Sequence, residues 1–184
     1  RLLSRGLGDV YKRQQLDGLT GLWNRTYFDG RLEQEIKLAR RHDRQLTLIM
    51  CDVDHFKSLN DNWGHPFGDH VLEAAAKTLT SAARTSDVVC RYGGEEFAII
   101  LPETASDSAK IVAERQREGL AALEWSVGDD LRVTASFGLA DLATVDGSME
   151  ALVKAADEAL YASKEGGRNR VTIAPGSNDL RLSA

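Results

Sequence analysis

The chain has 184 residues, of which 42% are hydrophobic and 28% are charged, a composition typical of one globular domain with its own core. Its formal net charge of −5 excludes a broad electrostatic footprint for nucleic acid. No apolar run approaches the roughly 20 residues that span a bilayer, and no signal segment opens the chain, so we expect a cytoplasmic protein that makes no membrane contact.

The two ends of the chain differ from its middle. Residues 1–14, RLLSRGLGDVYKRQ, have no clear periodicity and resemble translated adaptor sequence, so we interpret them as non-native or as a linker. The alternative is the frayed end of a helix from an upstream domain, and in either case we expect no sensory module within this chain. Residues 15–174 are predicted to form one domain, and residues 175–184 a C-terminal tail.

Helical and strand-like patterns alternate in the first half of the domain. Asn24 is the predicted cap of a long amphipathic helix. A continuous apolar run then predicts a buried strand over Leu46–Val53, which ends in acids. A short helix over 56–60 is predicted to end at the breaker Gly64-His65-Pro66, and apolar residues at every fourth position predict another helix over 67–82.

The second half opens with a predicted hairpin. Two apolar runs, 87–92 and 96–101, are joined through Gly93-Gly94. Each run has apolar residues at odd and even positions, so we expect both strands to be central in the sheet. The later elements are a helix over 106–123, a loop with Gly128-Asp129-Asp130, a strand over 131–140 in which Gly138 admits close packing, a helix from Met149 and a strand over 170–174.

This alternation of helices and strands around one hairpin predicts an α/β sandwich with a mixed sheet. Cys51 and Cys90 lie within the apolar strands and show no metal-ligand spacing. We interpret them as reduced core residues, with a disulfide between neighbouring strands as the alternative.

Four acids gather near the predicted turn. Asp52 and Asp54 end the first strand two positions apart, so both should point to one face, and Glu95 and Glu96 lie at the predicted hairpin apex. Adjacent carboxylates at a tight turn repel each other and stabilise no fold. With no lysine expected nearby to neutralise them, they suit Mg²⁺, which takes a few carboxylates together with phosphate oxygens. The alternatives are a solvated turn and a strand-end cap.

Glycines and cations complete the predicted site. Gly93 and Gly94 would allow positive φ and let a nucleotide lie on the turn. Lys57 begins the short helix, where free N–H groups could hold phosphate, and Lys164 and Arg168 share one face of the last helix with Asp157 and Tyr161. A metal, cations and phosphate-binding amides are the equipment of phosphoryl or nucleotidyl transfer. Taken singly, the two cations also suit a helix C-terminus.

Five ordered motifs resemble the GGDEF family, the diguanylate cyclases: DGLTGLWNR, CDVDHFKSLNDNWGHPFGD, RYGGEEF, VTASFGLA and ADEALYASKEGGRNR. RYGGEEF is the GGEEF variant of the family signature. The resemblance implies an adenylyl-cyclase-like, ferredoxin-like fold with a mixed five-stranded sheet and surrounding helices. It also implies that two GTP molecules condense to cyclic di-GMP with loss of two pyrophosphates, across a homodimer in which each domain holds one GTP.

The resemblance further implies roles for single residues. Asp52, Glu95 and the Val53 carbonyl would ligate Mg²⁺, with Mn²⁺ possible; Glu95 would help deprotonate the attacking hydroxyl, and Glu96 would support the metal site. The GTP contacts would come from Phe56, Lys57, Asn60, His65, Asp69, Gly93, Gly94, Lys164 and Arg168, of which Asn60 and Asp69 would read the guanine edge. His65 is equally consistent with a packing or turn residue.

Arg84-Thr85-Ser86-Asp87 matches the family's RxxD inhibitory motif, which implies that Arg84 and Asp87, with Arg115 as a secondary arginine, bind cyclic di-GMP and cause product inhibition. The alternative for Arg84 and Asp87 is a helix-end cation followed by a turn acid. Two other functions remain: a non-catalytic module that binds GTP or cyclic di-GMP and signals by contact, and an adenylyl-cyclase-like enzyme. The retained acids and cations favour the diguanylate cyclase.

Overall fold

The computed structural model describes residues 14–128 and 131–176. The predictions for residues 1–13 and 177–184, and for Asp129 and Asp130 of the predicted loop, therefore lie outside the described residues. Within them, no helix combines the length and the apolar character needed to cross a membrane.

A five-stranded sheet forms the middle layer, with the order β2-β3-β1-β4-β5. Neighbouring strands are antiparallel except β4 and β5, which are parallel, so the sheet is mixed as predicted. The strands are β1 (Leu46–Val53), β2 (Val88–Arg91), β3 (Glu96–Pro102), β4 (Ala135–Asp141) and β5 (Val171–Ile173).

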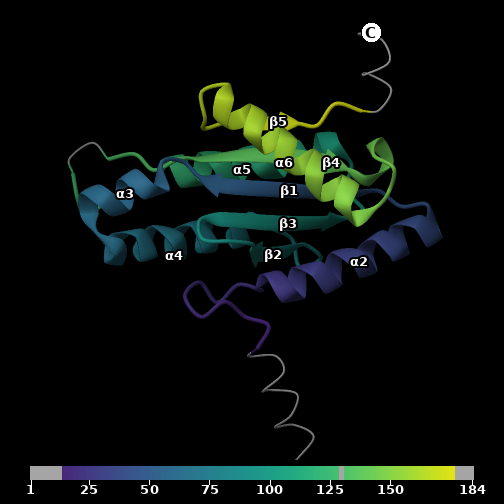
Figure 1. The fold of residues 1–184 in the computed structure, drawn as a ribbon, viewed down its shortest axis with the longest axis horizontal. Coiled ribbons are helices and arrows are strands. Elements are labelled where there is room, and N and C mark those ends of the chain that lie inside the picture. Colours follow the sequence, from purple (N-terminus) through teal and green to yellow (C-terminus); the bar gives the residue numbers. More distant parts are fainter. Residues whose placement is uncertain (1–13, 129–130, 177–184) are drawn as a thin grey trace, which may run out of the picture.

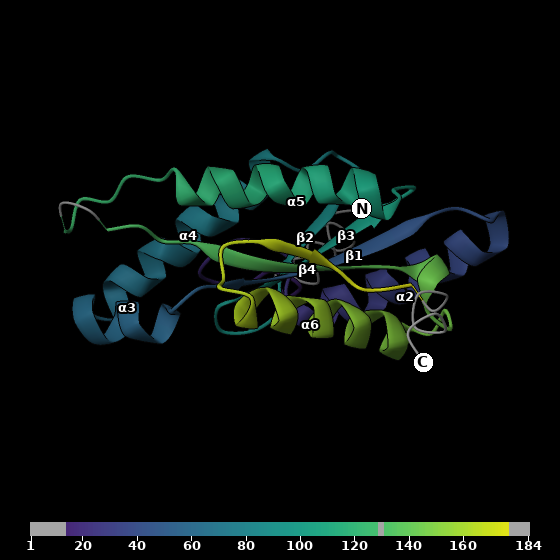
Figure 2. The same cartoon turned by 90° about the horizontal axis from the view of Figure 1, so that it is seen from above.

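Helices cover both faces of this sheet (Figures 1 and 2). One face packs against α4 and α5, and the other against α2 and α6, so each face has its own hydrophobic core. The helices are α2 (Arg25–His42), α3 (Phe56–Trp63), α4 (His65–Ser81), α5 (Ser106–Ala121) and α6 (Met149–Glu165), with a 3-10 turn at Leu142–Thr144.

The central position of β1, with helices on both faces of the sheet, explains its continuous apolar sequence. All of its residues are buried, with Ile49 and Cys51 in the core beneath α4 and α5 and Leu48 and Met50 in the core beneath α2 and α6. Each such side chain contributes about 1.5–3 kcal/mol of transfer free energy when fully buried. The strand therefore fixes the direction in which its last residues, the acids, leave the sheet.

Local signals mark several helix ends as predicted. Asn24 caps α2 by accepting from the Tyr27 N–H, and Gly64, with φ of 82°, separates α3 from α4. His65 and Pro66 do not belong to the break, because proline is tolerated in the first helical turn and α4 already begins at His65. The strand predicted over 131–140 begins only at Ala135.

The prediction that both hairpin strands are central is wrong for β2, which lies at the edge of the sheet. Its first three residues are nevertheless buried because α2 covers one face of the strand and α4 the other. Burial above and below a strand does not require a neighbour on each side. The outer side of β2 is partly covered by Trp23, whose carbonyl accepts the Arg91 N–H at 2.8 Å.

Cys51 and Cys90 are free and buried, as predicted. They lie on β1 and β2, which are separated by β3, so the alternative of a disulfide between neighbouring strands does not hold. Burial raises the pKa of the Cys90 thiol to about 12, which keeps it protonated.

Candidate active site

The end of β1 and the turn between β2 and β3 meet as the sequence predicted. The Val53 N–H donates to the Glu95 carbonyl at 3.2 Å, and Asp52 lies opposite Glu96 in the antiparallel register of β1 and β3. Because opposite residues of a ladder point to the same face, Asp52 and Glu96 both project toward α6. The acids that are distant in sequence therefore gather beside one turn.

Asp52 is the buried centre of this group, with 8% of its surface exposed. The expectation of no nearby lysine is wrong, because the Lys164 Nζ lies 2.9 Å from the Asp52 Oδ2. Burial nevertheless raises the pKa of the Asp52 carboxyl above its usual value; Lys164 opposes this rise, and the carboxylates of Glu95 and Asp54 add to it. A buried carboxylate among other acids favours a bound cation.

The turn itself differs from the prediction in two ways. Glu96 is not at the apex but is the first residue of β3. Gly93 and Gly94 are not among the glycines with positive φ. A Cβ on Gly93 would lie 2.6 Å from the Glu96 carboxylate, so the end of that flexible side chain would have to move, whereas a Cβ on Gly94 would meet nothing within 4 Å. The surface above Gly94 is therefore open to a ligand.

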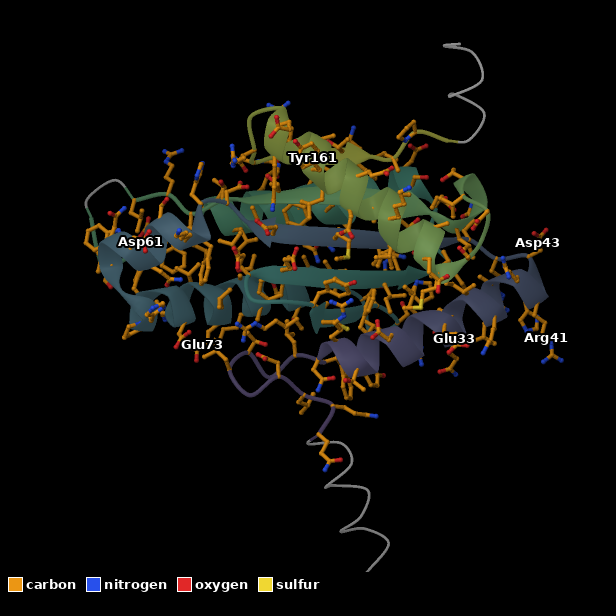
Figure 3. The ribbon with its side chains drawn as sticks, in the orientation of Figure 1. Glu33, Arg41, Asp43, Asp61, Glu73 and Tyr161 are labelled. Atoms are coloured by element: carbon orange, nitrogen blue, oxygen red, sulfur yellow. The ribbon has the colours of Figure 1, made fainter. Side chains whose placement is uncertain are left out.

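Glu96 faces the middle of α6. Burial raises the pKa of Asp157, the Glu96 carboxylate raises it further, and Arg25 and Lys164 lower it. Tyr161, expected on the same helix face as Lys164, is 65% exposed and lies on the outer side of α6 (Figure 3). The acidic group thus extends from Asp52 through Glu96 to Asp157.

Arg168 does not lie on the last helix as predicted, because α6 ends at Glu165. It belongs to the following loop, where Arg168 and Asn169 have φ of 61° and 44°, in the left-handed region. The Asn169 N–H donates to the Asp54 carboxylate at 3.0 Å, and the Arg168 N–H donates to the Ser163 carbonyl at the same distance. The loop after α6 is therefore connected to the end of β1.

The first turn of α3 supplies free backbone donors. Its cap residue, His55, has a left-handed φ of 55° and makes no side-chain cap, and within the described part of the chain the N–H groups of Phe56 and Lys57 have no acceptor. The Lys57 side chain is exposed beside them. Such a helix start attracts phosphate through its N–H groups and its dipole.

The two predicted guanine-reading residues lie on adjacent helices. Asn60 is on α3 and Asp69 on α4, next to Gly68, where a Cβ would fall 1.9 Å from the Asn60 Oδ1. That Oδ1 is buried and has no hydrogen-bond partner among the described residues. An acceptor without a donor suits the N–H groups of guanine. His65 is exposed at the first position of α4.

The predicted inhibitory residues surround the end of α4. The Asp87 carboxylate accepts the Arg84 N–H at 2.7 Å, which the simpler turn interpretation also requires, and the Arg115 guanidinium donates to the Ala82 carbonyl. Arg84 and Asp87 line a groove of about 450 Å³ together with Trp23. Arg84 and Asp87 therefore border one groove, whereas Arg115 does not line it and contacts the end of α4 through Ala82.

The contacts of Arg91 were not predicted from the sequence. The Arg91 guanidinium pairs with the Asp17 carboxylate at 3.0 Å and also donates to the Gly94 carbonyl at 2.8 Å. Asp17 in turn accepts from the N–H and hydroxyl of Thr20. The only sequence signal was the turn pattern DGLT before the first helix. Arg91 thus joins the N-terminal turn to the glycine turn of the site.

Comparison with known proteins agrees with this geometry. The sequence profile of the family "Diguanylate cyclase, GGDEF domain" matches residues 14–170. Diguanylate cyclase VdcA from Vibrio cholerae is 43% identical over 176 residues, which cover 92% of this chain and 50% of VdcA. Probable diguanylate cyclase DgcC from Escherichia coli is 40% identical over 158 residues, 86% of this chain and 43% of DgcC.

The fold has close counterparts among crystal structures. The coiled coil and GGDEF domain of DgcB from Caulobacter crescentus, in complex with c-di-GMP, has a TM-score of 0.86 and 36% identity over 94% of this chain and 92% of that one. This similarity to a solved structure confirms the predicted fold class. The chain spans 25% to 50% of the length of the curated relatives it matches. With most of its length matched, this chain belongs to the diguanylate cyclase GGDEF domain family.

Proposed function

We propose that residues 15–174 form a diguanylate cyclase domain that condenses two GTP molecules into cyclic di-GMP and two pyrophosphates. The observation that carries this proposal is that the Asp52 carboxylate lies near Glu95, beside the open surface at Gly94. The Lys164 Nζ lies 2.9 Å from the Asp52 Oδ2. Relatives named diguanylate cyclases support it. We place the reaction in the cytoplasm, where Cys51 and Cys90 would stay reduced.

The chemistry of the acids fits a divalent cation. Among the described residues, no three His, Cys, Asp or Glu side chains form a ready metal cage. Asp52 and Glu95, with the Val53 carbonyl, would therefore hold Mg²⁺ or Mn²⁺ together with phosphate oxygens, as Mg²⁺ prefers. When bound, the ion would neutralise charge on the phosphates. The pKa of Asp52 is raised even beside Lys164, because burial and the carboxylates of Glu95 and Asp54 outweigh that ion pair, and this supports a place for a further cation.

The remaining residues would orient GTP. The N–H groups at Phe56 and Lys57 and the side chains of Lys164 and Arg168 would bind the triphosphate, because these donors border the acids from α3 and from the end of α6. Glu95 would help to accept the proton of the attacking 3′-hydroxyl, and Glu96 would support the metal site.

Base recognition would come from α3 and α4. Asn60 and Asp69 would accept from guanine N1–H and N2–H₂, a pattern that adenine cannot supply. The buried, unpartnered Asn60 Oδ1 supports this. His65 would stand at the edge of the same pocket, since it begins α4.

Two further parts of the proposal concern assembly and control. Each domain would hold one GTP, so the reaction needs two domains face to face, and a two-fold symmetric product fits an isologous homodimer. Cyclic di-GMP would bind at Arg84, Asp87 and Arg115 and inhibit the enzyme. The accessible groove at Arg84 and Asp87 supports that site.

The deciding experiment is incubation of the purified chain with GTP and Mg²⁺, followed by identification of the nucleotide product. Cyclic di-GMP is expected from the wild type and none from Glu95→Gln, while Glu33→Gln on the exposed side of α2 should match the wild type. A folded wild type that binds GTP without turnover would instead favour the non-catalytic module, and a monomeric cyclic nucleotide would favour the adenylyl-cyclase-like enzyme.

A further inference from the structure

We infer that Asp54 is a positioning residue that acts through Arg168: its buried carboxylate holds the loop after α6 so that Arg168 stays at the site. The inference rests on the proposed function, in which Arg168 binds phosphate. Asp54 is 4% exposed and makes no ion pair among the described residues, in contrast to Asp52, which pairs with Lys164.

Three donors occupy the Asp54 carboxylate. The Ser136 hydroxyl donates to Oδ1 at 2.7 Å, the Thr134 hydroxyl to Oδ2 at 2.7 Å, and the Asn169 N–H to Oδ2 at 3.0 Å. The Asp54 N–H also donates to the Thr134 carbonyl at 2.8 Å. One side chain therefore connects the end of β1, the start of β4 and the loop after α6. Both of its oxygens already accept hydrogen bonds from the protein, which favours a structural role over ligand binding.

The loop needs such a hold because its backbone is unfavourable. Arg168 and Asn169 are consecutive non-glycine residues in the left-handed region, and such residues persist only where their surroundings determine them. The Asn169 N–H, held by Asp54, lies at the centre of this strained pair. Without that acceptor, the pair loses its hydrogen bond to the end of β1, its left-handed conformation is less well determined, and the Arg168 side chain would change direction.

A second contact holds the same residue from another helix. The Arg117 guanidinium on α5 donates to the Asn169 Oδ1 at 3.0 Å, and Arg117 is itself fixed by Glu114 at 2.7 Å. Asn169 is thus held by its backbone from β1 and by its side chain from α5. The two contacts explain how a loop that is exposed at Asn169 can keep one conformation.

The first test is hydrogen exchange over residues 163–172. Asp54→Ala should speed exchange of the Asn169 amide by about tenfold or more. The reason is that the Asn169 N–H loses the acceptor that protects it from exchange while the loop is closed. Asp54→Asn should remain near the wild type, since an amide oxygen can still accept from Asn169 while the Ser136 hydroxyl reverses. Asp141→Asn is the matched control: this buried aspartate lies at the other end of β4 and accepts from Ser106 and Ala143.

The second test is a double-mutant cycle with Arg168→Ala. Asp54→Ala should raise the KM for GTP by about tenfold, and little further in the Arg168→Ala background, because coupled residues do not act additively. Asp141→Asn should leave KM unchanged. If Asp54→Ala does not fold, Asp54→Ser replaces it, since its hydroxyl is too short to reach Asn169.

The outcomes separate this inference from the proposed function. Unchanged exchange over residues 163–172 in a folded Asp54→Ala or Asp54→Ser variant would overturn the inference, as would KM effects that multiply in the double variant. A wild type that makes no cyclic di-GMP would reject the proposed function, and the exchange measurement would still decide whether Asp54 holds the loop.

Discussion

Gly138 provides the most direct test of the packing that places Lys164. This residue of β4 lies directly beneath α6, and a Cβ on it would fall 2.1 Å from the Leu160 nitrogen and 2.2 Å from the Ala156 carbonyl oxygen. Both are backbone atoms, so no side chain can turn away. Gly138→Ala therefore requires α6 to move from the sheet by about 1 Å, and overpacking of this kind costs about 3 kcal/mol or more.

The displacement should reduce stability and activity together. For a domain of this size, about 3 kcal/mol lowers Tm by about 6–12 °C. The same movement carries Lys164 away from Asp52, now 2.9 Å apart, and a misplacement of about 1 Å can cost about a hundredfold in rate. Calorimetry and the rate of cyclic di-GMP formation measure the two effects.

Gly30→Ala is the matched control, because Gly30 lies on the exposed side of α2 and a Cβ there would meet nothing within 4 Å. Within a helix this change should stabilise the protein by about 0.5–1 kcal/mol. A Gly138→Ala variant that keeps the wild-type Tm would refute the close approach of α6 to β4, and an unchanged Tm with lost activity would show that packing is not the cause.

Three further results are expected. Arg84→Ala should abolish inhibition by cyclic di-GMP while the initial rate is retained. Persistent inhibition would favour the alternative interpretation of Arg84 as a helix-end cation without a regulatory role. Activity per domain should rise with protein concentration because two domains must meet, so constant specific activity over a hundredfold dilution would contradict the homodimer. Burial raises the pKa of Asp17, but hydrogen bonds from Thr20 and the Arg91 ion pair together hold it below the ordinary value of 3.8. Asp17 therefore stabilises the fold above that pH and loses this effect in more acidic solution, so Asp17→Asn should flatten the acid limb of unfolding free energy; parallel wild-type and variant curves would contradict this.

Much of the fold was predictable because its signals are local or periodic. The Asn24 cap, the Gly64 break and the buried run of β1 each act within a few residues, and each was confirmed. The convergence of Asp52 with the glycine turn was also predictable, because a strand that ends in acids and a hairpin that bears acids have few ways to pair in one sheet.

The errors have several causes. The ion pair of Lys164 with Asp52 depends on where α6 crosses the sheet, which no local pattern records. The helical spacing of Lys164 and Arg168 was extended past the true helix end, although Gly166 and Gly167 mark that end locally, and Asp54 then binds the left-handed loop at Asn169. The edge position of β2 was hidden because covering helices give an edge strand the same apolar pattern as a central one.

The outermost strands also bear on how two copies can meet. A long unpaired strand invites a foreign chain to add to the sheet and can start aggregation. Here β2 and β5 have four and three residues, and the Trp23 carbonyl already takes the Arg91 N–H on the outer side of β2. In the proposed homodimer, two such domains would therefore approach over their nucleotides without their sheets fusing, which would keep their encounter reversible.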